Sequence, residues 1–167
     1  MTTDMADKHV VALGYYDGFH VGHMAVIKAA EQTARSMAAS LLVLTFSEHP
    51  LKYLKGDAPD EIVSGKEKIK LIKELGIEIE YLDFNRVKDM EPEEFFSEIL
   101  VKKYNACGIC CGYNYRFGKA AAGTTQMLEE LSSVAGITFK AVPAVEYKGL
   151  PVSSTRIRKA LRDGEIE

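Results

Sequence analysis

Two histidines in the segment His20-Val21-Gly22-His23 have the chemistry and spacing suited to phosphate groups. Imidazoles supply hydrogen bonds or positive charge to phosphate oxygens near neutral pH. The glycine between them lets a ligand approach the backbone, and a helix that begins here favours an anion at its N-terminal end. The alternative is that both histidines are surface or capping residues. Their position after the first predicted strand favours the functional interpretation.

A basic segment near residue 160 is a second candidate site for an anion. Ser153, Ser154 and Thr155 can cap a helix whose first N–H groups stay available for phosphate oxygens. Four cations follow within seven residues, at Arg156, Arg158, Lys159 and Arg162. Because residues at i and i+2 diverge on a helix, Arg156 and Arg158 need not act on the same oxygen. The alternative is a solvated basic face with an ordinary helix cap.

The segment Gly112–Gly118 (GYNYRFG) follows a predicted strand and carries polar groups between its glycines. Asn114 offers a hydrogen-bond donor and an acceptor, and Arg116 offers a planar cation. The alternative is a glycine-rich turn with an aromatic side chain anchored in the core. The end of a second predicted strand, at Phe46, raises the same question, because Phe46 suits the core as well as a ligand.

Apolar runs with strand spacing alternate along the chain with segments of helical spacing. The expected strands are 9–13, 41–46, 78–82, 106–111 and 137–142. The expected helices are 21–37, 64–75, 92–104 and 124–134, with a last one that begins near Ser153. This order predicts an α/β, Rossmann-like, doubly wound parallel sheet of about five strands with helices on both faces. Ligands of such sheets bind at the carboxyl ends of the strands. The region 47–63 is expected to be a long loop, which is typical of functional segments.

Length and composition set limits on the class of protein. A chain of 167 residues fits one domain, 1–167, and its net charge of −3 argues against a general polyanion binder. Neither a membrane span nor a targeting segment is evident, so a cytoplasmic location is expected. The cysteines Cys107, Cys110 and Cys111 do not suit a disulfide framework. Cys107 and Cys110 are expected on opposite faces of a strand, which disfavours a zinc or redox site.

Four segments in the same order resemble a known family. They are Gly14–His23 (GYYDGFHVGH), Thr45–Pro50 (TFSEHP), Gly112–Gly118 and Val152–Arg158 (VSSTRIR). They are similar to motifs of the FMN adenylyltransferase (FAD synthetase) domain of the bacterial bifunctional riboflavin kinase/FAD synthetase family, in the nucleotidyltransferase superfamily. Departures are Tyr16 and Tyr115, where that family has phenylalanine, and Glu48, where it has proline. Glu48 removes a rigid residue and adds a charge to the loop.

The resemblance implies a role for each matching residue. The implied catalytic residues are His20, His23, Asn114, Arg156 and Arg158. The implied ATP-binding residues are Gly14, Tyr15, Asp17, Gly22, Ser153, Ser154 and Thr155. The implied flavin-binding residues are Phe46, Ser47, His49, Pro50, Tyr115, Arg116 and Phe117. Asp17 is either a Mg²⁺ ligand or a structural cap, and no protein metal site is expected because phosphates and water hold most of the Mg²⁺ in nucleotide sites.

The implied reaction joins FMN and ATP to make FAD and pyrophosphate, with Mg²⁺. The alternatives are another small-molecule nucleotidyltransferase, of the pantetheine-phosphate, nicotinamide-nucleotide or cytidylyl type, or a non-catalytic flavin or nucleotide sensor. The partners are then small molecules, with no nucleic acid and no membrane. The riboflavin kinase domain of the resembled enzymes is expected to be absent from these 167 residues, so that FMN would be made separately.

Overall fold

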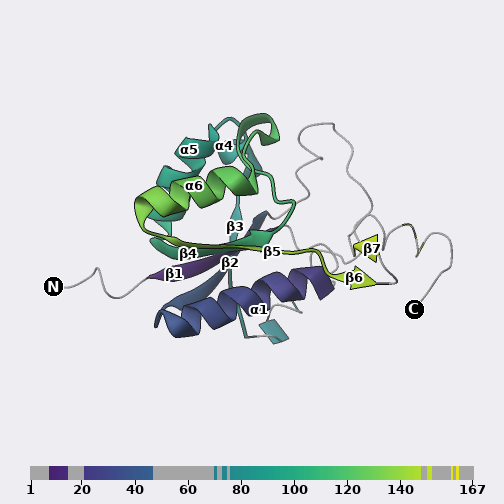
Figure 1. The fold of residues 1–167 in the computed structure, drawn as a ribbon. Helices are drawn as coiled ribbons and strands as arrows, with labels where there is room; N and C mark the ends of the chain where they lie inside the picture. Colours follow the sequence, from purple (N-terminus) through teal and green to yellow (C-terminus); the bar gives the residue numbers. More distant parts are fainter. Residues whose placement is uncertain are drawn as a thin grey trace.

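The computed structural model describes residues 8–14, 21–46, 70, 73, 74, 76–147, 150, 151, 159 and 161. Its centre is a parallel five-stranded sheet with the order β3-β2-β1-β4-β5. The strands are β1 (His9–Leu13), β2 (Ser40–Phe46), β3 (Glu78–Leu82), β4 (Ala106–Gly112) and β5 (Thr138–Val142). Helices lie on both sides of the sheet (Figure 1). The predicted fold class is confirmed.

Helix α1 (Val21–Ser36) covers one face of the sheet (Figure 1). Four apolar side chains of α1 that recur at helical spacing are all buried: Val26, Ile27, Ala30 and Ala34. They pack against sheet residues such as Val10, Val43 and Cys110. Close packing is possible because β4 has Gly108 here, where an added Cβ would lie 3.0 Å from Val10 and 3.4 Å from Thr33 of α1.

The opposite face carries α4 (Phe84–Val87), α5 (Pro92–Glu94), η3 (Phe95–Lys103) and α6 (Thr125–Ala135). The helix predicted for 92–104 is one turn of α-helix followed by a π-helix, in which the amide of Tyr104 donates to the carbonyl oxygen of Ile99 at 3.1 Å. The buried side chains of η3 are Phe95, Phe96, Ile99 and Leu100. Thr124 caps α6, as its hydroxyl accepts the amide of Met127 at 3.2 Å.

A β-bulge in β4 corrects one prediction. His9 pairs with Ala106 and Val10 pairs with Gly108, so Cys107 is an extra residue in β4. The extra residue breaks the alternation of faces, and Cys107 therefore packs on the α1 side together with Cys110 instead of on the opposite side. All three cysteines are free thiols.

Some short elements were not predicted, and some predicted segments lie outside the described residues. Strands β6 (Glu146–Tyr147) and β7 (Leu150–Pro151) form a short antiparallel pair, and η4 (Lys119–Ala121) is a 3₁₀ turn; none of the three was predicted. The 47–63 loop and most of the helices expected at 64–75 and after Ser153 lie outside the described residues. In the part of the chain that the structure describes, no helix has the length and apolar character needed to cross a bilayer.

Candidate active site

The order of the sheet determines where a ligand would bind. The chain passes from β1 outward to β2 and β3, and then returns to place β4 on the other side of β1. In sheets of this type the crevice opens beyond the carboxyl ends of the two strands where the order reverses. These ends are Leu13 of β1 and Gly112 of β4. Gly14 directly follows β1, and its amide donates to the carbonyl oxygen of Leu44 at 3.3 Å.

The N-terminal end of α1 is the second part of this edge. His23 lies in the first turn of α1 and is half-buried, and Gly22 precedes it. The first turn of α1 has no acidic residue of its own, so no carboxylate within the helix offsets the partial positive charge of its N-terminus. This end of the helix therefore favours an anion. Three further predicted residues of the motif, Tyr15, Asp17 and His20, lie outside the described residues.

Phe46 ends β2 at the same edge, and its ring has a structural role. The ring packs edge-on against Phe84 of α4, with 5.4 Å between the ring centroids. It also borders the core on the side of η3 and α6. These contacts favour the interpretation of Phe46 as a core residue. The neighbouring predictions Ser47, His49 and Pro50 lie outside the described residues.

The segment after β4 turns sharply and exposes its polar groups. The amide of Tyr115 donates to the carbonyl oxygen of Gly112 at 3.1 Å, which closes the turn. Asn114 and Arg116 are exposed on this turn. Tyr113 is also 45% exposed here. Tyr113 is not among the predicted site residues, and the signal for it in the sequence is its place between Gly112 and Asn114.

Aromatic packing fixes the position of this turn. Phe117 is only 6% exposed, and its ring centroid lies 5.7 Å from that of Phe95 and 6.1 Å from that of Tyr115, with which it stacks. The ring of Phe117 also covers Gly123, where an added Cβ would lie 2.6 Å from it. Phe117 therefore belongs to the core. Its predicted contact with flavin stays a prediction, while its ring packing holds the turn in place.

Backbone hydrogen bonds close the same loop. Phe117 and Gly123 each donate an amide to the other's carbonyl oxygen, at 3.3 and 2.7 Å. The amide of Lys119 donates to the carbonyl oxygen of Met90 at 2.7 Å, which attaches the loop to the segment before α5. The tip includes Ala120 and Ala121, both with a φ of 54°, a conformation that costs alanine roughly 1–2 kcal/mol per residue. The loop 117–123 is thus held by several contacts against local strain.

Burial controls the ionisation of two groups beneath the turn. Burial raises the pKa of the Tyr115 hydroxyl, and the neighbouring Cys111 raises it further. Burial, with a smaller contribution from Cys110, raises the pKa of the Cys111 thiol to about 12. Both groups are therefore neutral near pH 7, and Tyr115 does not supply a phenolate base.

The predicted basic segment is represented by two residues. Lys159 and Leu161 are helical and exposed, while Ser153, Ser154, Thr155, Arg156 and Arg158 lie outside the described residues. The described site residues that meet at one edge of the sheet are Gly14, Gly22, His23 and the turn at Asn114 to Arg116. Within the described ranges, no group of three or more His, Cys, Asp or Glu residues is arranged to hold a metal ion.

The sequence of this chain is similar to those of known bacterial proteins. The chain is 35% identical over 165 residues to the bifunctional riboflavin kinase/FMN adenylyltransferase of Bacillus subtilis, an alignment that covers 96% of this chain and 51% of that protein. The Escherichia coli K12 protein of the same name is 26% identical over 160 residues, covering 94% of this chain and 51% of its own length. The chain thus spans about half the length of the curated relatives it matches.

Solved structures give the same fold. A Streptococcus pneumoniae structure described as a macrolide-efflux protein aligns with a TM-score of 0.81 and 34% identity, over 96% of this chain and 52% of that chain. A pantoate-β-alanine ligase from Francisella tularensis aligns with a TM-score of 0.51 and 16% identity, over 96% of this chain and 70% of that chain. The latter similarity concerns the fold alone. The family model for FAD synthetase matches residues 2–156, and the chain therefore belongs to the FAD synthetase family.

Proposed function

We propose that this chain is an FMN adenylyltransferase, which makes FAD and pyrophosphate from FMN and ATP. The observation that carries the proposal is the FAD synthetase match over residues 2–156, together with His23 in the first turn of α1 at the sheet's switch point. A phosphate oxygen of FMN attacks the α-phosphorus of ATP in line. The new P–O bond forms as the bond from the α-phosphorus to the bridging oxygen breaks, and pyrophosphate leaves with that oxygen.

Catalysis in this proposal is positioning and charge stabilisation. The FMN phosphate is already anionic, so neither a protein nucleophile nor a strong general base is needed. His20 and His23 stabilise charge at the α-phosphate, with Gly14, Tyr15, Asp17 and Gly22 beside the nucleotide. Ser153, Ser154, Thr155, Arg156 and Arg158 hold the leaving phosphates. The buried Tyr115 hydroxyl is neutral, and burial raises its pKa further above the ordinary 10.0, so it adds no negative charge beside the phosphates.

The flavin lies, in this proposal, on the side of β2 and the turn after β4. Ser47, His49, Pro50, Tyr115 and Arg116 contact FMN, and Asn114 lies near the reacting phosphates. Phe46 and Phe117 act through packing, since Phe46 rests on Phe84 and Phe117 on Phe95.

ATP enters as its Mg²⁺ complex. Asn114 is exposed, and its carboxamide oxygen is a hard donor of the kind that Mg²⁺ would accept. Among the described residues no acidic cluster would compete with the phosphates for the ion. We propose that residues 1–167 form one domain that acts in the cytoplasm on FMN.

A direct assay tests this proposal. Purified chain mixed with FMN and MgATP should form FAD and pyrophosphate in equal amounts, measured by chromatography and a coupled pyrophosphate assay. Riboflavin with MgATP should form neither FMN nor FAD. Transfer to phosphopantetheine or nicotinamide mononucleotide in preference to FMN would reassign the acceptor. Tight FMN binding without pyrophosphate release would make the chain a flavin sensor and overturn the proposal.

A further inference from the structure

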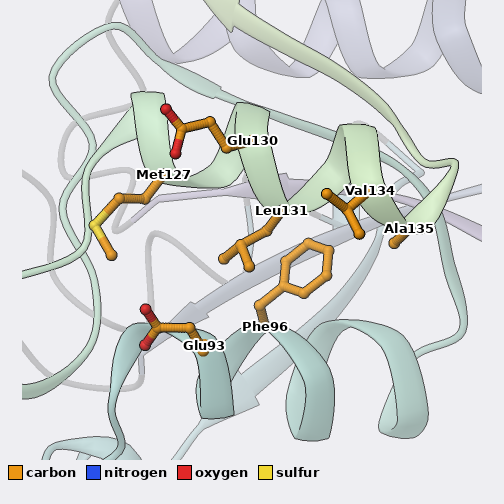
Figure 2. Close-up of a pocket in the computed structure, with 7 residues that line it drawn as sticks. All are labelled: Glu93, Phe96, Met127, Glu130, Leu131, Val134 and Ala135. Atoms are coloured by element: carbon orange, nitrogen blue, oxygen red, sulfur yellow. The ribbon is translucent and has the colours of Figure 1, made fainter.

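An apolar groove lies between α6 and the helix formed by α5 and η3, on the face of the sheet opposite α1 (Figure 2). Its volume is about 320 Å³. Figure 2 shows Phe96 and Leu131 at its centre, Val134 and Ala135 at one end, and Met127 with Glu93 at the other. Val134 is 92% exposed, although it is a large aliphatic side chain. The groove is therefore apolar surface that the described part of the chain leaves uncovered.

The residues that line the groove have helical spacing. Met127, Glu130, Leu131 and Val134 form one wall, at positions i, i+3, i+4 and i+7 of α6, and Glu93 and Phe96 form the other. Grooves between two helices accept the apolar face of a third helix, which places side chains at the same spacing. A small molecule is a poorer fit, because pockets for such ligands hold a few convergent polar groups. Among the described residues that line the groove, the polar side chains are two carboxylates.

Charge further limits what can cover the groove. Within the described lining of the groove, the two ionisable residues, Glu93 and Glu130, are both acidic. Among the described residues neither carboxylate takes part in an ion pair, and Glu130 accepts only a hydrogen bond from the Gln126 amide at 3.3 Å. Helices α5 and α6 contain four glutamates and no lysine or arginine. The lysines of η3 are engaged elsewhere, because Lys102 pairs with Glu98 and Lys103 lies over the Tyr104 ring. A cation at the rim of the occupant would therefore meet an unneutralised carboxylate.

The same charges disfavour a second copy of the chain on this groove. A two-fold dimer would bring the same patch of both copies together, so that Glu93 and Glu130 would face carboxylates of the same kind. Like charges that face each other in an interface cost binding energy. From the spacing, the exposure of Val134 and the acidic rim, we propose that the groove is a docking site for a helix of a partner protein, with an apolar stripe flanked by Lys or Arg.

A model peptide tests this surface on the full-length chain. The probe is a fluorescein-labelled synthetic helix with leucines at i, i+3, i+4 and i+7 and lysines beside them. Its binding, followed by fluorescence anisotropy, should weaken as salt is raised. A peptide with glutamate in place of each lysine, and a scrambled peptide of the original composition, should bind at least roughly tenfold more weakly.

Matched variants locate the binding. Glu130→Lys should weaken binding of the lysine peptide by roughly tenfold, whereas Glu31→Lys on α1, across the sheet, makes the same change of charge and should leave it unchanged. Val134→Asp should also weaken binding. Because Val134 is exposed, this change should leave the circular dichroism spectrum unchanged, which is measured in parallel. With ¹³C-methyl methionine, the Met127 signal should shift on binding, and those of Met24 and Met37 should not.

Three results would overturn the proposal. The first is equal weakening by Glu31→Lys and Glu130→Lys, which would reflect net charge alone. The second is a Met127 signal that the peptide leaves unmoved. The third is self-association in sedimentation experiments that Val134→Asp abolishes, which would make a second copy the occupant. FAD formation by the Val134→Asp variant should equal that of the unchanged chain, so this test is independent of the proposed reaction.

Discussion

His23 and His9 lie near opposite ends of β1. A comparison of variants at the two positions therefore distinguishes the loss of site chemistry from the general effect of losing an imidazole. His23 is in the first turn of α1, beside the carboxyl end of β1. His9 begins β1 at the other end, where its Nδ1 lies 2.7 Å from the carbonyl oxygen of Tyr104. The two imidazoles thus have the same chemistry in two very different positions relative to the candidate site.

His23→Ala should lower the rate of FAD formation by ~10²–10³-fold, the effect typical of losing one donor that stabilises charge in a transition state. The measurement is kcat for FMN with saturating MgATP. His9→Ala is the matched control and should retain nearly full kcat, with any loss confined to stability. Full turnover by His23→Ala would remove His23 from the mechanism.

Cys111 gives a prediction about pH and stability. Its thiol has a pKa of about 12 in the folded chain, against 9.0 for an ordinary thiol. Between these values the unfolded chain releases this proton and the folded chain keeps it, so stability is full below pH 9 and falls as pH rises toward 12. One such group contributes a slope of up to ~1.4 kcal/mol per pH unit.

Urea denaturation at several pH values from pH 9 upward measures this slope. Cys111→Ala should lower stability at every pH, because it leaves a cavity, but it should make the dependence on pH shallower. Cys107→Ala is the control, since the half-buried Cys107 thiol should change the slope less. Parallel curves for Cys111→Ala and the unchanged chain would contradict the assignment.

At the scale of elements, the spacing of apolar residues was sufficient to predict a helix or strand where burial alone decides its structure. Strands His9–Leu13 and Glu78–Leu82 have the predicted bounds, because runs or alternations of apolar residues fit a sheet covered by helices. The π-helical form of η3 and the bulge at Cys107 leave no signal in residue spacing. They arise from how the helix and β4 meet the rest of the sheet, which a single segment does not encode.

The candidate site shows the same division. Asn114 and Arg116 are exposed on the turn after β4, as their polar side chains suggested, whereas Phe117 from the same motif is buried. An aromatic residue in a glycine-rich segment suits either environment, so its spacing could not decide between ligand and core. The contacts that place Phe117 in the core are with Phe95, which is distant from the motif in sequence, and with Gly123, which follows it.

The loop 117–123 supports a prediction about these contacts. Gly123→Ala would place a Cβ 2.6 Å from the Phe117 ring, so the ring or the loop must shift. Overpacking of this kind costs roughly 1–3 kcal/mol. We expect a lower midpoint of thermal unfolding and a raised KM for FMN, because the turn at Asn114 and Tyr115 rests on Phe117.

A double variant isolates that contact. Gly123→Ala combined with Phe117→Leu should recover part of the stability that Gly123→Ala loses, because the smaller side chain makes room for the added methyl group. The sum of the two single effects would be the result for independent sites. A purely additive loss would show that the Phe117 ring is not what Gly123 accommodates.

At the scale of the whole molecule, two surfaces have different proposed tasks. The switch point between β1 and β4 opens at the carboxyl ends of the strands, where α1 begins. The apolar groove with its acidic rim lies on one face of the sheet, between α6 and the α5–η3 helix, and extends along α6 as far as Ala135. Substrates and a helical partner would therefore contact different sets of residues on one chain.

Hydrogen exchange can test this separation on the intact chain. With FMN and MgATP present, amides of the α1 first turn and of Tyr113 to Arg116 should exchange more slowly, because ligand binding suppresses local opening. Amides at the C-terminal end of α6, near Gly136, and at Asn105 before β4 should change only by the global gain in stability, which reaches ~2.7 kcal/mol at a ligand concentration of 100 Kd. Protection centred on α6 instead would place the substrates in the groove, and the division of tasks between the two surfaces would be wrong.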